Sequence, residues 1–152
     1  MVRTVFRVGR ATAHRIRAIV IAGTLMVVGV LNLLPGVVLV APGRLGQLYG
    51  LSGLDEDLLV LLRHRAMLLA LVGGFLIAAL VRPGWRQPAL LAGLLSNVAF
   101  VLLVLAAPTS AEISRVASID LALLPLLGCA LALDVLGARR RSTDPAPATA
   151  DV

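Results

Sequence analysis

Four long apolar runs constrain the fold of this chain more than any other feature of its sequence. A helix needs about 20 predominantly apolar residues to cross the ~30 Å hydrocarbon layer of a bilayer. The runs reach or approach that length and are rich in Ala and Leu, whereas the strands of a membrane barrel are only about ten residues long. We therefore expect an all-α membrane protein, a four-helix bundle with spans at residues 18–41, 58–81, 89–107 and 119–136.

The composition also points to a membrane location. Of the 152 residues, 59% are hydrophobic and 14% are charged, whereas soluble domains contain about 45–50% apolar and about 25% charged residues. A soluble monomer of this size cannot bury so many apolar side chains. A disulfide-stabilised fold is excluded as well, because Cys129 is the only cysteine. These numbers indicate an integral membrane protein.

We divide the chain into three segments. Residues 1–17 form a basic cytoplasmic segment, residues 18–137 hold the four spans, and residues 138–152 form a basic and then disordered cytoplasmic tail. A cleaved signal peptide is the alternative for the first span, because such peptides also place a basic segment before an apolar run. This run is too long for a signal peptide and no small-residue cleavage site follows it, so we expect a retained helix.

Residues that commonly begin or end helices stand near the limits of the spans. Acidic residues 55–57 precede the second span, where the helix dipole favours negative charge. Thr109 and Glu112 have the spacing of a capping box before the fourth span, and Gly137 follows its last apolar residue. The Pro35-Gly36 pair is expected to break the first span near its end.

The distribution of arginine predicts the orientation in the membrane. All 14 basic residues are Arg: five lie in the N-terminal segment, two between the second and third spans, and three after the fourth. The positive-inside rule places these three segments in the cytoplasm, so both termini are expected there, with the protein in the plasma membrane. The Arg residues flank apolar runs instead of lining one polar face, which favours membrane lipids over nucleic acid as their partner.

Arg63 and Asp120 form the sharpest hypothesis for a polar site, since ionisable residues within a span are functional candidates. A stripe of small residues marks one face of the second span and consists of Ala66, Ala70, Gly73 and Gly74. Arg63 lies within this stripe by helical phase, whereas Arg65 points nearly the opposite way. We expect an Arg63–Asp120 ion pair, with Arg65 facing the lipid headgroups or another subunit. The alternative is that both partners only lie in the membrane interface.

Uncharged polar residues complete the candidate polar cluster. Asn32 and Asn97 lie deep in the first and third spans, where hydrogen bonding between helices is the ordinary role and contact with a ligand is the alternative. His64 lies near the outer surface, but the only other histidine is in the N-terminal segment, so we expect no metal site. The cluster therefore comprises Arg63, Asp120, Asn32, Asn97 and His64.

The fourth span holds two further polar residues. Asp134 lies near its inner boundary, where Arg82, Arg86 or Arg139 is expected to pair with it. Cys129 lies mid-span on the face opposite Asp120, where a thiol commonly packs as a small hydrophobic group.

Signatures of catalysis and of nucleotide binding are missing from the sequence. It contains no P-loop, no Gly-rich dinucleotide motif, no zinc-protease motif, no C-x-x-C and no nucleophile elbow. We therefore expect no cofactor and no catalytic residue, and an enzymatic role is the least favoured of the functions considered.

Three short segments carry a resemblance to a known group of proteins. They are Leu48-Tyr49-Gly50, Arg63-His64-Arg65-Ala66, and Arg115 followed by Asp120. With the span pattern from about Ile16 to Gly137, they make the chain similar to small bacterial four-helix membrane proteins of unknown function, DoxX-like in architecture. The resemblance implies a four-helix membrane fold and no defined activity.

Some members of that group carry the label phosphopantetheine adenylyltransferase, which this sequence argues against. That reaction belongs to a soluble α/β fold with an H-x-G-H-type motif. Here His14 is followed by Arg15-Ile16 and His64 by Arg65-Ala66, so the motif is missing.

Two functions from different classes follow from these observations. The first is a non-enzymatic accessory or interaction subunit that self-associates or joins a larger membrane complex, since the loops are short and small-residue stripes favour contact between helices. The alternative is a small-molecule or lipid binder or transporter, with the candidate polar cluster lining a cleft that opens to the outer side.

Overall fold

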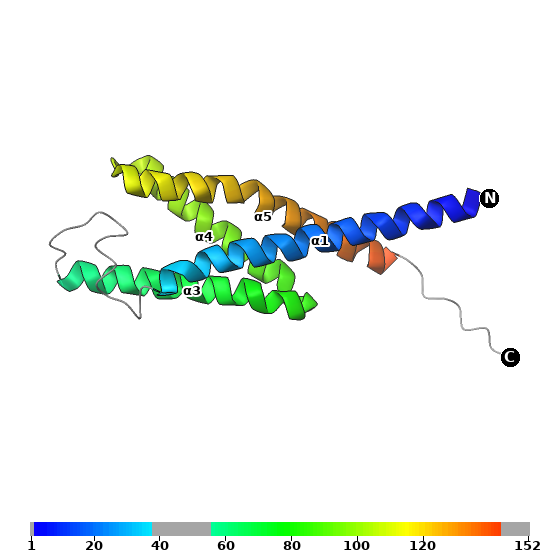
Figure 1. Ribbon diagram of the computed structural model, residues 1–152, viewed down its shortest axis with the longest axis horizontal. Coiled ribbons are helices and arrows are strands. Elements are labelled where there is room, and N and C mark those ends of the chain that lie inside the picture. The colour runs from blue at the N-terminus through cyan, green and yellow to red at the C-terminus, as the bar shows by residue number, and fades with distance from the viewer. Residues whose placement is uncertain (1, 38–55, 144–152) are drawn as a thin grey trace.

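The computed structural model describes residues 2–37 and 56–143, and every regular element in these two ranges is helical. Four helices are long and apolar enough to cross a membrane, which confirms the predicted number of spans. A short 3₁₀ turn, η2, joins the second and third of them (Figure 1). The elements are α1 (Val2–Val37), α3 (Glu56–Val81), η2 (Pro83–Trp85), α4 (Arg86–Ala106) and α5 (Ala111–Thr143).

Two helices are longer than the sequence predicted. Helix α1 begins at Val2 and continues through Pro35 to Val37, so the basic segment is a continuation of the first span and the predicted break is wrong. Pro35 stands in the last turn of α1, where losing one backbone donor costs little. Helix α5 likewise contains Pro125 and runs past Gly137 to Thr143. Residues 38–41 of the predicted first span lie outside the described residues.

The start of α5 differs from the predicted capping box by one residue. Ser110 precedes the helix, and its hydroxyl accepts a hydrogen bond from the backbone N–H of Ile113 at 3.4 Å. Its carbonyl accepts from the N–H of Ser114 at 3.0 Å. Thr109 instead shares a 3.1 Å hydrogen bond between its hydroxyl and that of Ser114. Ser110 therefore satisfies the first donors of α5, in place of the predicted Thr109.

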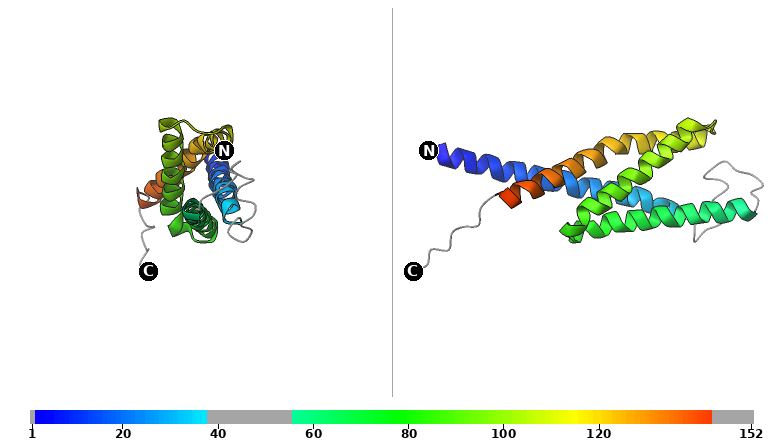
Figure 2. Two further views of the ribbon diagram at one scale, coloured as in Figure 1. Left: turned by 90° about the vertical axis from the view of Figure 1, so that its left-hand side faces the viewer. Right: turned by 180° about the vertical axis from the view of Figure 1, so that it is seen from behind.

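The helices form two closely packed pairs, α1 with α3 and α4 with α5. Successive helices run in alternating directions, and α1 crosses α5 (Figures 1 and 2). We call the end that holds the start of α1, the α3–α4 turn and the end of α5 the N-terminal end of the bundle. The α4–α5 turn and the start of α3 lie at the opposite end (Figure 1).

Close contact between α1 and α3 depends on glycine. A Cβ added at Gly73 would lie 2.6 Å from the carbonyl oxygen of Gly29 and 2.9 Å from the backbone nitrogen of Leu33. A Cβ added at Gly36 would lie 2.7 Å from the Cβ of Ala70. The stripe that includes Ala70 and Gly73 is therefore a helix contact, as predicted, and its partner is α1.

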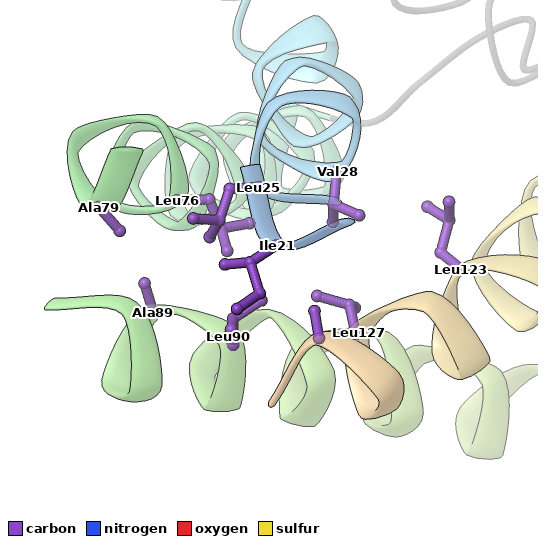
Figure 3. Close-up of a cluster of buried hydrophobic side chains, with 10 residues drawn as sticks. Ile21, Leu25, Val28, Leu76, Ala79, Ala89, Leu90, Leu123 and Leu127 are labelled. Carbon is purple, nitrogen blue, oxygen red and sulfur yellow. The ribbon is translucent and has the colours of Figure 1, made fainter. Parts of the chain in front are cut away.

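The core lies where all four helices meet. Side chains from each helix converge there (Figure 3). The buried members are Ile21, Leu25 and Val28 from α1, Leu76 and Ala79 from α3, Ala89 and Leu90 from α4, and Leu123, Leu127 and Ala130 from α5.

Most of the apolar surface faces outward. Only 22% to 33% of the most apolar stretch of each helix is buried inside the protein. Large side chains such as Ile19 and Leu105 are 70% and 78% exposed. An apolar surface of this extent is stable against lipid and unstable against water, so the four helices have the features of a multi-pass membrane protein.

Candidate functional site

The five residues of the candidate polar cluster come from all four helices. Arg63 and His64 lie near the start of α3, Asp120 lies in the first half of α5, and Asn32 and Asn97 lie in α1 and α4. Within the described residues, no hydrogen bond or ion pair joins any two of them. They are therefore separate polar positions and not one contact network.

Arg65, and not Arg63, is the arginine whose charge acts on Asp120. Both Arg65 and Asp120 are half-buried, and the carboxylate interacts electrostatically with this guanidinium. The guanidinium carbon of Arg65 also lies 4.3 Å from the ring centroid of Phe100 on α4. No ion pair joins Arg63 to Asp120 within the described part of the chain, so the predicted pair is missing from the structure.

Helix phase explains why Arg65 takes the place next to Asp120 that was predicted for Arg63. The small-residue stripe on α3 packs against α1, as the contacts of Gly73 and Ala70 show. Arg63 is in phase with that stripe and so lies on the α1 side of α3. Arg65 is about 200° further around the helix, toward α4 and α5. The phase of Arg63 was predicted correctly, but the helix that it faces was not.

We predict that Arg65→Ala destabilises the protein more than Arg63→Ala. The Arg65 change removes a cation–π contact and leaves the half-buried Asp120 without its positive neighbour, with an expected loss of about 1–2 kcal/mol. Thermal unfolding in mild detergent measures the difference. The double variant Arg65→Ala/Asp120→Asn should recover part of the loss, and an equal or larger effect of Arg63→Ala would contradict the assignment.

The two asparagines of the cluster behave differently from each other. Asn32 is buried and its side-chain amide donates to the carbonyl oxygen of Val28 at 2.9 Å, so this amide bonds within α1 and not between helices. Asn97 is only 2% exposed, and its Nδ2 has no acceptor within the described residues. The buried Nε of Arg63 also lacks an acceptor there. These two nitrogens are the unsatisfied donors of the candidate polar cluster.

His64 is exposed. In the described ranges, no group of three His, Cys, Asp or Glu side chains lies close enough to hold a metal ion. Cys129 is also exposed, on the outer surface of α5.

A buried ion pair that the sequence analysis missed lies toward the N-terminal end of the bundle. Asp134 of α5 is 6% exposed. One carboxylate oxygen lies 3.9 Å from Nη2 of Arg17 in α1, and the other accepts a 3.1 Å hydrogen bond from Nε2 of Gln87 in α4. The Arg17–Asp134–Gln87 cluster therefore ties three helices together through one carboxylate.

Gly137 makes room for this ion pair. A Cβ at position 137 would overlap the guanidinium of Arg17. Any residue larger than glycine would therefore displace that guanidinium from its position beside α5. Helix α5 continues past Gly137 to Thr143, so the predicted helix-ending role of this glycine is wrong. A signal for the pair exists in the sequence, because Arg17 shares a helix face with Ile21, Leu25 and Val28 by its spacing.

No family model matches the chain, and comparison with curated proteins and with solved structures finds no relative either. The resemblance to DoxX-like membrane proteins therefore stays a hypothesis.

Proposed function

We propose that the chain is a multi-pass plasma-membrane protein with both termini in the cytoplasm, which acts as a non-enzymatic accessory or interaction subunit. The arginine distribution supports this orientation. The three Arg-rich segments of the sequence belong to the start of α1, the α3–α4 turn and the end of α5, which share the N-terminal end of the bundle. The positive-inside rule then assigns that end to the cytoplasm.

Single-cysteine labelling tests the orientation. Cys129→Ala removes the only cysteine, and Gly84→Cys or Pro108→Cys then places one thiol at either end, since both positions are exposed turn residues. In intact cells, a membrane-impermeant maleimide should label Pro108→Cys, and it should label Gly84→Cys only after permeabilisation. The reverse pattern would overturn the proposed orientation.

The observation that supports the subunit role is an outward-facing apolar surface that includes exposed glycines with no neighbour inside the chain. Gly23 of α1 and Gly74 of α3 are exposed, and nothing in the chain lies within 4 Å of a Cβ built at either. Glycine on an outer face of a membrane helix lets the backbone of another helix approach closely. The packing within the chain gives no reason for glycine at these two positions, so contact with a further helix is the role that we propose.

Affinity purification of the tagged full-length protein from native membranes in mild detergent tests this role. We expect a stoichiometric membrane-protein partner or a second copy of the chain. Gly74→Leu should reduce its recovery at least several-fold without lowering the thermal midpoint of the purified protein, because nothing in the chain lies within 4 Å of a Cβ built at position 74. Gly84→Ala, in the exposed α3–α4 turn, is the matched control. Recovery of a monomer alone would contradict the subunit role.

The alternative function is binding or transport of a small molecule or lipid through an outer-facing polar cleft. It is supported by the buried Nδ2 of Asn97 and Nε of Arg63, since buried donors usually have acceptors. Mass spectrometry of small molecules that co-purify with the protein distinguishes it from the first. A defined compound that is lost in Asn97→Leu, with no protein partner present, would favour this alternative.

A further inference from the structure

The α3–α4 turn combines two arginines with the only tryptophan of the chain. Arg82 precedes the 3₁₀ turn η2, Trp85 ends it, and Arg86 begins α4. The turn joins the ends of two candidate spans, so by length it lies at a membrane surface. Trp and Arg at such a position are typical of the headgroup region.

A stack of side chains fixes the position of Arg82. Its guanidinium carbon lies 4.4 Å from the ring centroid of Trp85. Trp85 in turn meets Phe75 of α3 edge to face, with ring centroids 5.7 Å apart and an interplanar angle of 63°. The cation–π contact uses the face of the guanidinium and leaves the N–H groups at its edge free to donate hydrogen bonds. Within the described residues, no side chain accepts a hydrogen bond from the N–H groups of Arg82.

Arg86 adds a second positive charge, which forms no ion pair with any described residue. The residue is half-buried, its Nε is fully enclosed, and no acceptor within the described residues bonds to that Nε. Asp134 of α5 accepts a hydrogen bond from the adjacent residue Gln87, and its other carboxylate oxygen already faces Arg17. A half-buried charge without a counter-ion is unfavourable, so an anion from outside the chain would stabilise this turn.

The turn is open to the outside at Gly84. Gly84 stands between Pro83 and Trp85, and nothing lies within 4 Å of a Cβ built on it. The guanidinium groups of arginine match phosphate oxygens in geometry as well as in charge. The arrangement thus offers two positive charges and an exposed glycine on a turn that is anchored by an aromatic pair.

We propose that this turn binds the phosphate of an anionic lipid headgroup through Arg82 and Arg86, with Trp85 holding Arg82 in place. A soluble phosphate compound offers the same oxygens, but the position at the ends of two spans favours a lipid. The proposal depends neither on the subunit role nor on which side of the membrane the turn faces, so its failure would leave both untouched.

Trp85 reports on this site directly, because its fluorescence is the only tryptophan signal of the chain. Purified full-length protein in a neutral detergent is titrated with phosphatidylglycerol, and its emission is recorded. We expect a saturable change, with a much weaker response to phosphatidylcholine, whose headgroup has no net charge. Each basic residue near a membrane surface contributes about fivefold to the binding of anionic lipid. The double variant Arg82→Gln/Arg86→Gln should therefore bind about 25-fold more weakly.

Arg115→Gln is the matched control, since Arg115 is an exposed arginine at the opposite end of the bundle. It should bind as the unmodified protein does. Equal affinity of the double Gln variant and the unmodified protein would overturn the proposal. Saturation by inorganic phosphate without a response to phosphatidylglycerol would assign the site to a soluble phosphate and overturn the lipid as its ligand.

The double variant Arg82→Lys/Arg86→Lys covers the case in which the Gln variant does not fold. It keeps both charges but loses the planar donors and most of the stacking on Trp85. We expect phosphatidylglycerol to bind it about fivefold more weakly than the unmodified protein. Unchanged affinity would contradict the assigned role of the arginine geometry.

Discussion

Gly73→Ala should destabilise the protein by about 1–3 kcal/mol, although alanine is the better helix former. The added methyl group would meet the carbonyl oxygen of Gly29 at 2.6 Å and the backbone nitrogen of Leu33 at 2.9 Å. Backbone atoms within a helix cannot rotate away as a side-chain tip can, so α1 has to shift away from α3. A lower midpoint of thermal unfolding in mild detergent measures the effect.

Gly74 provides an internal control for that experiment. It is the next residue of the same helix, and nothing lies within 4 Å of a Cβ built on it. Gly74→Ala should therefore show only the gain in helix propensity, a stabilisation of up to about 1 kcal/mol. A similar effect of the two substitutions, whatever its sign, would show that α1 and α3 do not depend on contact at Gly73.

Arg17→Leu is expected to have the second large effect, a loss of about 3 kcal/mol. Asp134 is 6% exposed and would lose the positive charge that it faces, while its hydrogen bond from Gln87 remains. Removing one partner of a buried ion pair is costly because the other charge stays behind without compensation. Arg15→Leu is the matched control, since Arg15 is exposed on the same helix and should change the unfolding midpoint little.

A double-mutant cycle separates the ion pair from the packing around it. Asp134→Leu alone leaves Arg17 unpaired and should also destabilise the protein. Arg17→Leu/Asp134→Leu replaces both charges with apolar groups, which is often neutral, so it should be more stable than either single variant. Strictly additive losses in the cycle would mean that the two side chains do not interact.

The sequence was most informative where one local signal decides the outcome. The four spans follow from apolar length alone. The limits of α3 are marked by Glu56 and Asp57 at its start and by Pro83 just beyond its end. The small-residue stripe was also recognised, because Ala70 and Gly73 recur at helical spacing. Each of these predictions rests on residues that lie close together in the chain.

Predictions that need the identity of a neighbouring helix were less successful. Periodicity shows that Arg63 and Gly73 share a face, but it does not show that this face meets α1 instead of α5. The pairing of Asp120 was therefore assigned to Arg63 when Arg65 is its neighbour. Arg17 was placed in a basic segment before the first span because the apolar run begins after it, whereas helix α1 runs without a break through that boundary.

The tie between Arg17 and Asp134 also has a consequence for how the chain is made. Ribosomes synthesise α1 before α5. Arg17 is therefore made well before Asp134, its carboxylate partner, and before Gly137, beside which its guanidinium lies. Until then the two early helices can hold together through their glycine contacts, but the first helix has no charge partner. The contact between Arg17 and Asp134 can therefore form only after α5 has been synthesised.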